Sequence, residues 1–378
     1  MPSRVGINLL WLVPGAVGGS EEATVALLRE IASLAPDDVR YLLFALPAFA
    51  AAHPALAAAF PVELAPLDGR FKPLRAAAEN SWLATKTRRA GLDMVHHMGG
   101  VMPVLRRCPG VLTIHDLQPF EMPENFSGTR RGYLRHLVPR SVQRAELVLT
   151  PSEFVRQTVI DRFGVAPERV RATPWGVEEA RVNVTVAEVQ ARYGLPRRWF
   201  VLPAVTWPHK NHLMLIRAFA TVAAREHDVV LVLTGAPAQA EQQVRDEILR
   251  LGLRGRVRRT GRIPRRDVLA IVRGAVALTF PSRYEGFGLP VLEAMSQGTP
   301  VVAAAATALP EVVAGAGRLI DPDDTEEWAA VMLQLLGDGD ERERLAAAGL
   351  LRARDFTWAA SARMTVDAHR DALAGATP

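Results

Sequence analysis

Short apolar segments alternate with longer amphipathic segments along most of this chain. Ten apolar runs of strand length can be recognised, and each ends near polar residues or glycine. They are residues 4–13, 39–46, 93–97, 110–116 and 145–152, followed by 198–206, 228–235, 256–263, 276–282 and 298–305. Buried strands that are separated by helices are typical of βαβ units, which build parallel sheets. The chain is therefore predicted to belong to the α/β class.

The strand–helix pattern occurs twice, once in each half of the 378 residues. We expect two Rossmann-like, doubly wound parallel-sheet domains, 1–180 and 198–355, joined by a linker at 181–197. A C-terminal helix, 356–378, is expected to pack back towards the first domain. Ligands of such sheets lie outside the carboxyl ends of the strands. Two facing domains are therefore expected to share a central cleft.

The composition, with 49% hydrophobic and 22% charged residues, is that of a globular protein with a sizeable core. A single cysteine, Cys108, excludes an intrachain disulfide and a cysteine-rich zinc site, and favours a cytoplasmic setting. The net charge of +5 permits an anionic substrate or membrane surface, and no basic stretch is interleaved with aromatics as in nucleic-acid binders. The apolar stretch 41–62 is interrupted by three prolines, which argues against a membrane span.

The strongest site signal is the segment 282–302, "SRYEGFGLPVLEAMSQGTPVV". Glu285 follows a strand, Gly286–Gly288 form a flexible loop, and Pro290 suits the first turn of a helix that runs to about Gln297. The amide groups at such a helix start bind anions. Glu285 and Glu293 would bracket this anion site, and two carboxylates in that arrangement suit the hydroxyls of a sugar nucleotide.

Three further segments carry candidate site residues. Gly18-Gly19 follow the first strand, and Ser20 is predicted to cap the next helix. His115 and Asp116 end the strand 110–116. His96 and His97 end another strand, and because adjacent strand residues point to opposite faces, at most one of them would face a cleft. No third ligand accompanies the two histidines, so no metal site is predicted.

The segment "EGFGLPVLEAMSQGTPVV" resembles the paired-glutamate signature of the retaining glycosyltransferases of family 4, which have the two-domain GT-B fold. The resemblance covers nearly the whole chain in the family's order, through "GAVGGSEEATVALLREIA", "TIHDLQPF", "LVLTPSEF", "VRATPWGV", "PAVTWPHKNHLMLIRAF", "TALPEVVAGAGRLIDP" and "FTWAASAR". It implies that the first domain binds the acceptor and the second binds the nucleotide sugar.

The resemblance also implies roles for individual residues. Lys210 would contact the donor diphosphate, Glu285 the donor sugar, and His115 the sugar near the reaction centre. Glu293 would bind the ribose hydroxyls and Ile263 would frame the base. The other donor-binding positions would be Gly18, Gly19, Gly286, Phe287, Gly288 and Leu289. Asp116 and His97 are expected on the acceptor side.

One expected cation is missing from the sequence. Many family members have an arginine five residues before the lysine that matches Lys210, and here that position is Val205. His209, Arg262 and Arg283 are candidates for supplying the charge. Lys210 itself is one of only three lysines among 45 basic residues, so it is mildly informative in a chain where arginine is the default. A compact ammonium suits a diphosphate as a point charge.

The expected reaction is transfer of a hexosyl group from a nucleotide sugar, with GDP-mannose favoured, to a glycan, lipid-linked or small-molecule acceptor. Retention of configuration is implied by the resemblance. Same-face attack is favoured because no residue is an obvious covalent nucleophile. Lys210 and the helix start at 288–291 supply fixed positive charge that can stand in for a divalent metal, so no metal or other cofactor is expected. The alternatives are a sugar-nucleotide 2-epimerase of the same fold and a non-catalytic scaffold that binds nucleotide sugars. A dinucleotide oxidoreductase is disfavoured because the N-terminal glycines lack a G-x-G-x-x-G pattern. The basic segment 129–144 is either a solvated helix face or a surface for an anionic membrane or lipid diphosphate, so peripheral membrane contact is left open.

Overall fold

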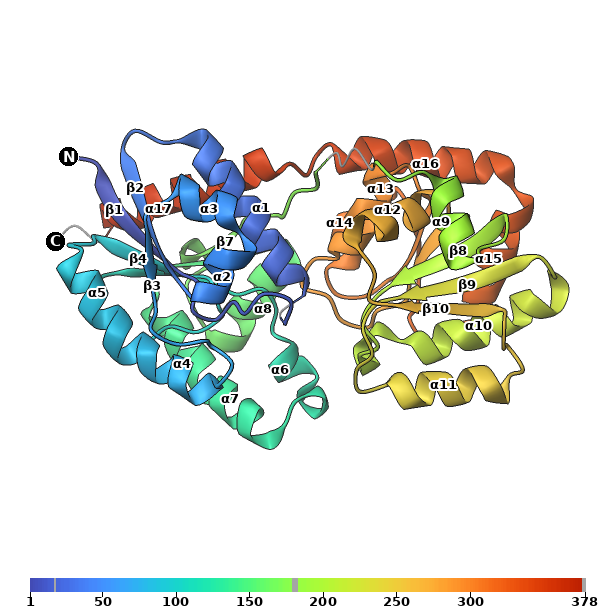
Figure 1. Ribbon diagram of the computed structural model, residues 1–378, viewed down its shortest axis with the longest axis horizontal. Coiled ribbons are helices and arrows are strands. Elements are labelled where there is room, and N and C mark those ends of the chain that lie inside the picture. The colour runs from blue at the N-terminus through green and yellow to red at the C-terminus, as the bar shows by residue number, and fades with distance from the viewer. Residues whose placement is uncertain (17, 179–182, 376–378) are drawn as a thin grey trace. The chain divides into compact units, whose positions relative to one another are not determined.

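The computed structural model describes the chain except for residues 17, 179–182 and 376–378 (Figure 1). The chain folds into two compact units. The first unit contains Met1–Gly176 together with Trp358–Pro378, and the second contains Val177–Thr357. Both units are α/β layers built on an all-parallel sheet.

The first unit has a seven-stranded sheet in the order β3-β2-β1-β4-β5-β6-β7. Its strands are β1 (Ser3–Asn8), β2 (Val39–Ala45), β3 (Val62–Leu64), β4 (Met94–His97), β5 (Gly110–Thr113), β6 (Leu147–Thr150) and β7 (Val170–Ala172). The helices are α1 (Gly19–Leu34), α2 (Pro47–Ala52), α3 (Pro54–Ala59), α4 (Lys72–Ala78), α5 (Ala84–Arg89), α6 (Gln118–Glu121), α7 (Gly128–Arg144), α8 (Glu153–Phe163) and α17 (Trp358–Gly375). A π-helical turn, Glu79–Leu83, joins α4 to α5, and 3-10 turns occupy Pro123–Asn125 and Pro167–Arg169.

The second unit has a six-stranded sheet in the order β10-β9-β8-β11-β12-β13. Its strands are β8 (Arg198–Pro203), β9 (Val229–Thr234), β10 (Val257–Gly261), β11 (Ala277–Phe280), β12 (Val301–Ala304) and β13 (Arg318–Ile320). The helices are α9 (Val186–Tyr193), α10 (His212–Arg225), α11 (Glu241–Arg250), α12 (Arg265–Arg273), α13 (Leu289–Ser296), α14 (Leu309–Val313), α15 (Thr325–Gly337) and α16 (Gly339–Ala353), with a 3-10 turn at Pro208–Lys210.

The strand order identifies one special position in each sheet. The chain leaves β1 in one direction to form β2 and β3, and then returns to the other side of β1 to form β4. The same reversal occurs between β8 and β11 in the second unit. At such a switch point the connections after neighbouring strands diverge and leave a crevice at the carboxyl edge, where doubly wound sheets bind their ligands.

All ten predicted strands are present, and three were not predicted: β3, β7 and β13. Each has three residues and lies at the edge of its sheet, so it is too short to show a periodic pattern. The prediction that Ser20 caps the first helix is wrong, because α1 begins at Gly19 with Gly18 as its N-cap. The expected linker region 181–197 contains α9, which packs against α12 in the second unit.

The C-terminal helix α17 completes the core of the first unit. Its apolar residues Trp358, Ala362, Val366 and Ala372 lie in the same buried cluster as residues of β1, β2 and α1. α17 packs mainly against α1, so the two ends of the chain share one core. Within the part of the chain that the structure describes, no helix is both long and apolar enough to span a membrane.

Candidate functional site

The loops after β8 and β11 place Lys210 and Glu285 together at the switch point of the second unit. Lys210 ends the 3-10 turn after β8, and its Nζ forms an ion pair with Glu285 Oε1. Both side chains are largely buried, with 17% and 12% of their surface exposed. The Lys210 ammonium also lies 5.4 Å from the centre of the Phe280 ring. The backbone N–H of Glu285 donates to Thr307 Oγ1 at 2.9 Å, which fixes the loop.

The N-terminus of α13 begins four residues after Glu285. Gly288 is the N-cap, and no side chain caps the helix there. Its φ of 109° is a conformation that favours glycine, and a Cβ at this position would lie 2.6 Å from Leu309 Cδ2. The amide groups and dipole of α13 therefore reinforce the positive charge of Lys210 at one end of the loop, as an anionic ligand requires.

Glu293 lies in the second turn of α13, with 12% of its side chain exposed. Its Oε1 is 2.5 Å from Arg265 Nη2, an ion pair between α13 and the first residue of α12. Ile263 lies two residues before Arg265 in the loop after β10, where it is half-buried. The predicted ribose-binding and base-framing positions thus belong to neighbouring segments at the carboxyl edge of one sheet.

The structure describes all three candidates for the missing cation near Val205. Burial, followed by the charge of Lys210, lowers the pKa of His209 to about 3, so its imidazole is neutral at physiological pH. Arg283 is engaged with Asp323, its Nε lying 3.0 Å from Oδ1. Arg262 is exposed in the loop after β10. The replacement cation therefore stays a prediction.

In the first unit, Gly18 is the N-cap of α1 and Gly19 is its first residue. Gly18 has a φ of 77° and ψ of −140°, a conformation available mainly to glycine. A Cβ at either glycine would meet no described atom within 4 Å. The open space beside both residues is consistent with their predicted place along a bound ligand.

His115 follows β5, and its ring is held between two indoles. The ring centres of Trp11 and Trp175 lie 5.5 and 5.7 Å from that of His115. Nε2 is 2.8 Å from the carbonyl oxygen of Met98, to which it must donate, and burial lowers the pKa of His115 to about 4. Nδ1 is therefore a hydrogen-bond acceptor, and it has no partner among the residues described. This neutral imidazole suits accepting a hydrogen bond from a hydroxyl.

Asp116 and His97 both have local partners. Asp116 Oδ1 accepts from the backbone N–H of Gln118 at 2.9 Å, which supports the start of α6. His97 is buried, and its Nδ1 lies 3.2 Å from the side-chain amide of Asn8. Burial lowers the pKa of His97 to about 3. These contacts give both residues a structural task, and their predicted role on the acceptor side stays a prediction.

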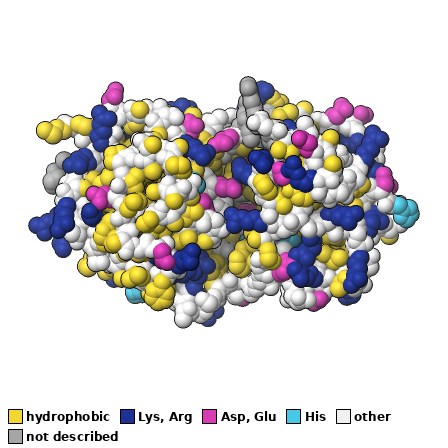
Figure 2. All heavy atoms as spheres, viewed as in Figure 1, with side chains coloured by type: hydrophobic (Ala, Val, Ile, Leu, Met, Phe, Trp, Pro, Cys, Tyr) yellow, Lys and Arg dark blue, Asp and Glu magenta, His cyan; other side chains and the backbone are white. Residues whose placement is uncertain are grey.

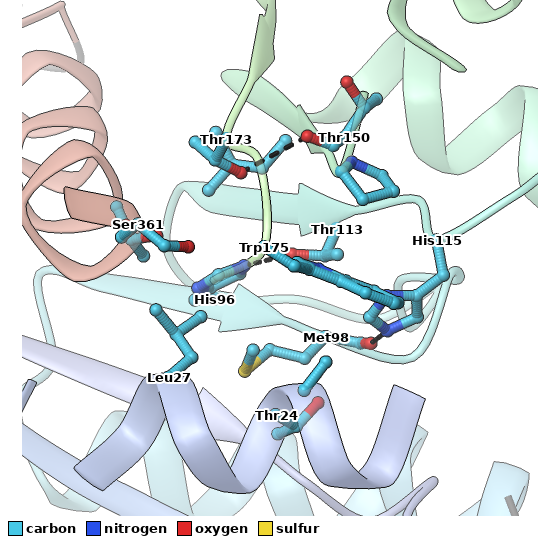
Figure 3. Close-up of a pocket in the computed structure, with 14 residues that line it drawn as sticks. Thr24, Leu27, His96, Met98, Thr113, His115, Thr150, Thr173, Trp175 and Ser361 are labelled. Carbon is cyan, nitrogen blue, oxygen red and sulfur yellow. Dashed lines mark hydrogen bonds between the residues drawn. The ribbon is translucent and has the colours of Figure 1, made fainter. Parts of the chain in front are cut away.

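His96 and His97 point to opposite faces of the sheet, as predicted. His96 lies 2.7 Å from Thr113 Oγ1 and 3.0 Å from His369 Nε2 on α17, and it lines a small cavity with Thr24, Trp175 and others (Figure 3). The cavity has a volume of about 20 Å³, enough for one water molecule. No group of three or more metal-ligating side chains occurs among the described residues.

Comparison with known proteins identifies the family. Residues 17–181 match the family model described as Glycosyltransferase Family 4, and residues 198–352 match the model described as Glycosyl transferases group 1. The chain is 34% identical over 284 residues to O-antigen chain mannosyltransferase B of Escherichia coli, covering 74% of each chain. The protein belongs to glycosyltransferase family 4.

Two further relatives of this glycosyltransferase extend the comparison. It is 26% identical to O-antigen chain mannosyltransferase RfbU of Salmonella typhimurium over 70% of this chain and 71% of that protein. The crystal structure of Anabaena HepE in complex with UDP and glucose matches with a TM-score of 0.76 at 22% identity, covering 98% of this chain and all of that one. Together with the two parallel sheets, these matches confirm the predicted GT-B fold and an enzyme that transfers a glycosyl group from a nucleotide sugar.

Three residues of this glycosyltransferase's candidate site were missed by sequence reasoning. Arg265 pairs with Glu293, and Trp11 and Trp175 enclose His115. Arg265 directly follows the "GRIP" segment, but in a chain with 42 arginines another arginine attracts no attention. The two tryptophans come from segments far apart in the sequence and meet only when β1, β5 and β7 are arranged in one sheet.

Proposed function

We propose that the enzyme transfers a mannosyl group from GDP-mannose to an acceptor hydroxyl with retention of configuration and without a metal ion. The mannosyl donor is supported by the names of the O-antigen mannosyltransferases to which the chain is similar. The Lys210–Glu285 pair beside the N-terminus of α13 is the observation that carries the proposed site. It combines a cation for a diphosphate with a carboxylate for sugar hydroxyls.

The reaction breaks the bond between C1 of the sugar and the diphosphate oxygen, and forms a bond from C1 to the acceptor oxygen. Positive charge develops on the sugar and negative charge on the leaving diphosphate. Lys210 and the amide groups at the start of α13 stabilise that negative charge from fixed positions. The departing diphosphate takes the proton of the attacking hydroxyl on the same face of the sugar. His115 Nδ1 accepts a hydrogen bond from a sugar hydroxyl.

The acceptor is proposed to be a glycan, a lipid-linked sugar or a small molecule with free hydroxyls. The five arginines of segment 129–144 favour an anionic acceptor. A sugar-nucleotide 2-epimerase would interconvert its donor in the absence of any acceptor, and a binding scaffold would turn over nothing. Product analysis with GDP-mannose alone and with acceptors therefore separates the three functions.

A thermal-shift panel of GDP, UDP, ADP and dTDP with their sugars tests the donor. GDP and GDP-mannose are expected to raise the melting temperature most, because a ligand stabilises the folded state in proportion to the logarithm of its concentration over its Kd. The same panel is repeated with EDTA, which is expected to leave the shifts unchanged. A larger stabilisation by UDP or dTDP than by GDP would show that the donor carries that nucleotide and is not GDP-mannose. Loss of the shift in melting temperature with EDTA would contradict metal independence.

A further inference from the structure

Surface charge does not single out a further site on the first unit. Basic side chains are scattered among hydrophobic ones over the face of this unit that Figure 2 shows. Buried polar atoms are more informative, because an unpaired donor or acceptor costs free energy that a ligand can recover. Trp11 Nε1 and His115 Nδ1 are two such atoms: both are buried, and neither has a hydrogen-bond partner within the described part of the chain.

The two atoms belong to rings that are in contact at the carboxyl edge of the first sheet. Trp11 lies in the loop after β1 and His115 in the loop after β5, and their ring centres are 5.5 Å apart with the planes inclined at 45°. Strand β4 lies between β1 and β5 in the sheet, and its loop contacts both rings. The Met98 carbonyl oxygen lies 2.8 Å from His115 Nε2 (Figure 3), and Gly99, the next residue, lies against the Trp11 indole. The pair therefore borders the switch point of this sheet, where a ligand is expected.

Both rings are held in place by their surroundings. A Cβ at position 99 would lie 2.5 Å from Trp11 Cγ, so glycine is needed there for the indole to pack this closely. The carbonyl oxygen of Trp11 accepts from Arg75 Nη1 at 2.8 Å, which fixes the loop after β1. The hydrogen bond from Nε2 to Met98 leaves His115 Nδ1 as the acceptor nitrogen. The two unpartnered atoms are thus one donor and one acceptor on fixed rings, and they do not bond to each other.

A hydroxyl group is the chemical partner that satisfies both atoms. The indole N–H only donates and the neutral imidazole Nδ1 accepts, whereas a hydroxyl accepts one hydrogen bond while donating another. One oxygen can bond to both nitrogens when these lie within about 6 Å of each other, which rings with centres 5.5 Å apart allow. Burial lowers the pKa of His115 to about 4, so its ring stays neutral at physiological pH. Trp11 and His115 are each only half-buried as whole residues, so a ligand has access to part of both.

Other ligand groups fit the pair less well. A carboxylate or a carbonyl oxygen accepts from the indole but has no proton for the imidazole, and an ammonium donates to the imidazole but cannot accept from the indole. A water molecule would pair with both atoms, and a sugar hydroxyl would displace it while making the same two hydrogen bonds. A sugar hydroxyl is therefore the substrate group that matches the pair in a glycosyltransferase.

We propose that Trp11 is a specificity-determining residue whose indole N–H donates to a sugar hydroxyl while the same hydroxyl donates to His115 Nδ1. The inference rests on the proposed glycosyl transfer, in which His115 accepts from a sugar hydroxyl, and adds the second partner of that hydroxyl. A site that pairs both sides of a hydroxyl strongly rejects a sugar that lacks it, because two buried groups then stay unpaired. The enzyme is therefore expected to require this hydroxyl in its substrate.

Tryptophan indole signals in nuclear magnetic resonance spectra test the pair directly. The full-length protein has seven tryptophans, and the signal of Trp11 is the one absent from Trp11→Phe, a variant that keeps an aromatic ring but lacks the N–H. Saturating GDP-mannose is expected to move the Trp11 indole proton downfield, as a new hydrogen bond does, and GDP is expected to leave it in place. Methyl α-mannoside added to the GDP-saturated protein is the probe for a hydroxyl of the acceptor.

The spectra also identify the source of the hydroxyl. A downfield shift with GDP-mannose assigns it to the transferred sugar, and a shift with methyl α-mannoside alone assigns it to the acceptor. An indole signal that no sugar moves overturns the proposal, because the N–H then has no sugar partner. An equal shift with GDP and with GDP-mannose also overturns it, since the nucleotide rather than a sugar hydroxyl would be responsible.

Calorimetric titration measures the selectivity for the hydroxyl. The ligands are the probe that moves the Trp11 signal and its deoxy analogues, each lacking one hydroxyl. The wild type is expected to bind one analogue at least tenfold more weakly than the parent sugar, and Trp11→Phe is expected to bind the same two ligands within threefold of each other. Trp82→Phe is the matched control: it removes an indole N–H from a ring packed on Phe44 in the same unit and should discriminate as the wild type does. Full tenfold discrimination by Trp11→Phe would contradict the role of its N–H.

Failure at Trp11 can be distinguished from failure of the proposed donor. If another sugar nucleotide stabilises the protein more than GDP-mannose in the thermal-shift panel, it replaces GDP-mannose as the probe, and the pair is tested in the same way. If no nucleotide stabilises the protein, the donor proposal fails, and methyl α-mannoside alone still tests Trp11. If nucleotides stabilise the protein and no sugar moves the Trp11 signal, only the role of Trp11 is refuted.

Discussion

Lys210 and Glu285 neutralise each other, and this pairing determines what a substitution of either residue does. Both side chains are largely buried, so removing one leaves the other as a poorly compensated charge. A donor diphosphate would bring Lys210 a second anion, while the donor sugar would bring hydroxyls to Glu285. The ion pair therefore keeps both groups in position before the substrate arrives.

We expect Lys210→Ala to lower kcat at least tenfold, which corresponds to about 1.4 kcal/mol in the activation barrier. The reason is the loss of the cation that stabilises the leaving diphosphate. Lys86→Ala is a matched control, because it removes a lysine from an ion pair with Glu63 in the first unit; it should keep at least half of the wild-type kcat. A melting curve shows whether Lys210→Ala is folded, and near wild-type kcat in a folded variant would contradict the leaving-group role.

Glu79 offers a separate prediction about stability. Burial raises its pKa from the usual 4.5 to about 7, so the folded protein binds its proton more tightly than the unfolded chain does. The stability that this proton contributes is complete below about pH 4.5 and is lost as the pH rises to 7. Glu79→Gln, which carries no charge, is therefore expected to be more stable than the wild type at pH 8 by about 3 kcal/mol. Urea unfolding at pH 5 and 8 measures the difference, and an unchanged difference between the two pH values would refute it.

At the scale of single residues, the sequence predicted those that belong to a continuous motif. Lys210, Glu285 and Glu293 were selected because their neighbours match the family pattern, and the structure places them on neighbouring loops and helices of one sheet. Arg265 was not selected, because arginine is too frequent here to carry information. The aromatic partners of His115 could not be predicted, because their proximity depends on the packing of strands that are distant in the sequence.

At the scale of secondary-structure elements, α17 is fixed to the sheet through buried histidines. Tyr41 Oη lies 3.0 Å from His369 Nδ1, and His369 Nε2 lies 3.0 Å from His96 Nδ1. The other ring nitrogen of His96, Nε2, lies 2.7 Å from Thr113 Oγ1. All three contacts are satisfied when each histidine is neutral, donating through one nitrogen and accepting through the other. A proton added to either ring would place a positive charge in a fully buried site, which burial disfavours.

We expect acid to destabilise the first unit through these histidines. Burial lowers the pKa of His369 to about 3 and that of His96 well below its ordinary value of 6.5. The unfolded chain therefore binds more protons than the folded one below about pH 6.5, and the stability present above that pH is lost as it falls. Each such histidine contributes a slope of about 1.4 kcal/mol per pH unit.

The histidine contribution can be measured with His369→Gln. This variant keeps a donor and an acceptor but does not titrate, so its free energy of unfolding should depend less steeply on pH between 6 and 4 than that of the wild type. His227→Gln, at a position outside both sheets, is a control in which the slope should not change. Parallel pH profiles for His369→Gln and the wild type would show that His369 does not control this stability.

The sequence also predicted most elements, and it failed for the short ones. The ten predicted strands have four or more residues, whereas β3, β7 and β13 have three residues each. Edge strands of this length are defined by their hydrogen bonds to a neighbour rather than by their own pattern. The N-cap of α1 was predicted two residues too late, because the positive φ of Gly18 was not recognisable from the sequence.

At the scale of the whole molecule, the two units have separate cores. Trp358, the first residue of α17, is buried in the core of the first unit although it follows the second unit in sequence. Trp358→Ala is expected to destabilise the first unit by about 3–5 kcal/mol, since it removes a large buried side chain. Limited proteolysis should then cut first within residues 1–176, while nucleotides still stabilise the second unit. Equal protease sensitivity of both units would contradict this separation.

The return of α17 to the first unit determines the order in which the chain can fold during synthesis. Residues 177–357 are contiguous, so the second unit has all of its strands and helices as soon as this segment has left the ribosome. Most of the first unit is synthesised earlier, but α17, which completes its core, is synthesised after the second unit. The first unit must therefore wait, with an apolar face of α1 uncovered, until α17 has been synthesised. The nascent N-terminal half is consequently the portion of this protein with the greatest need of a chaperone.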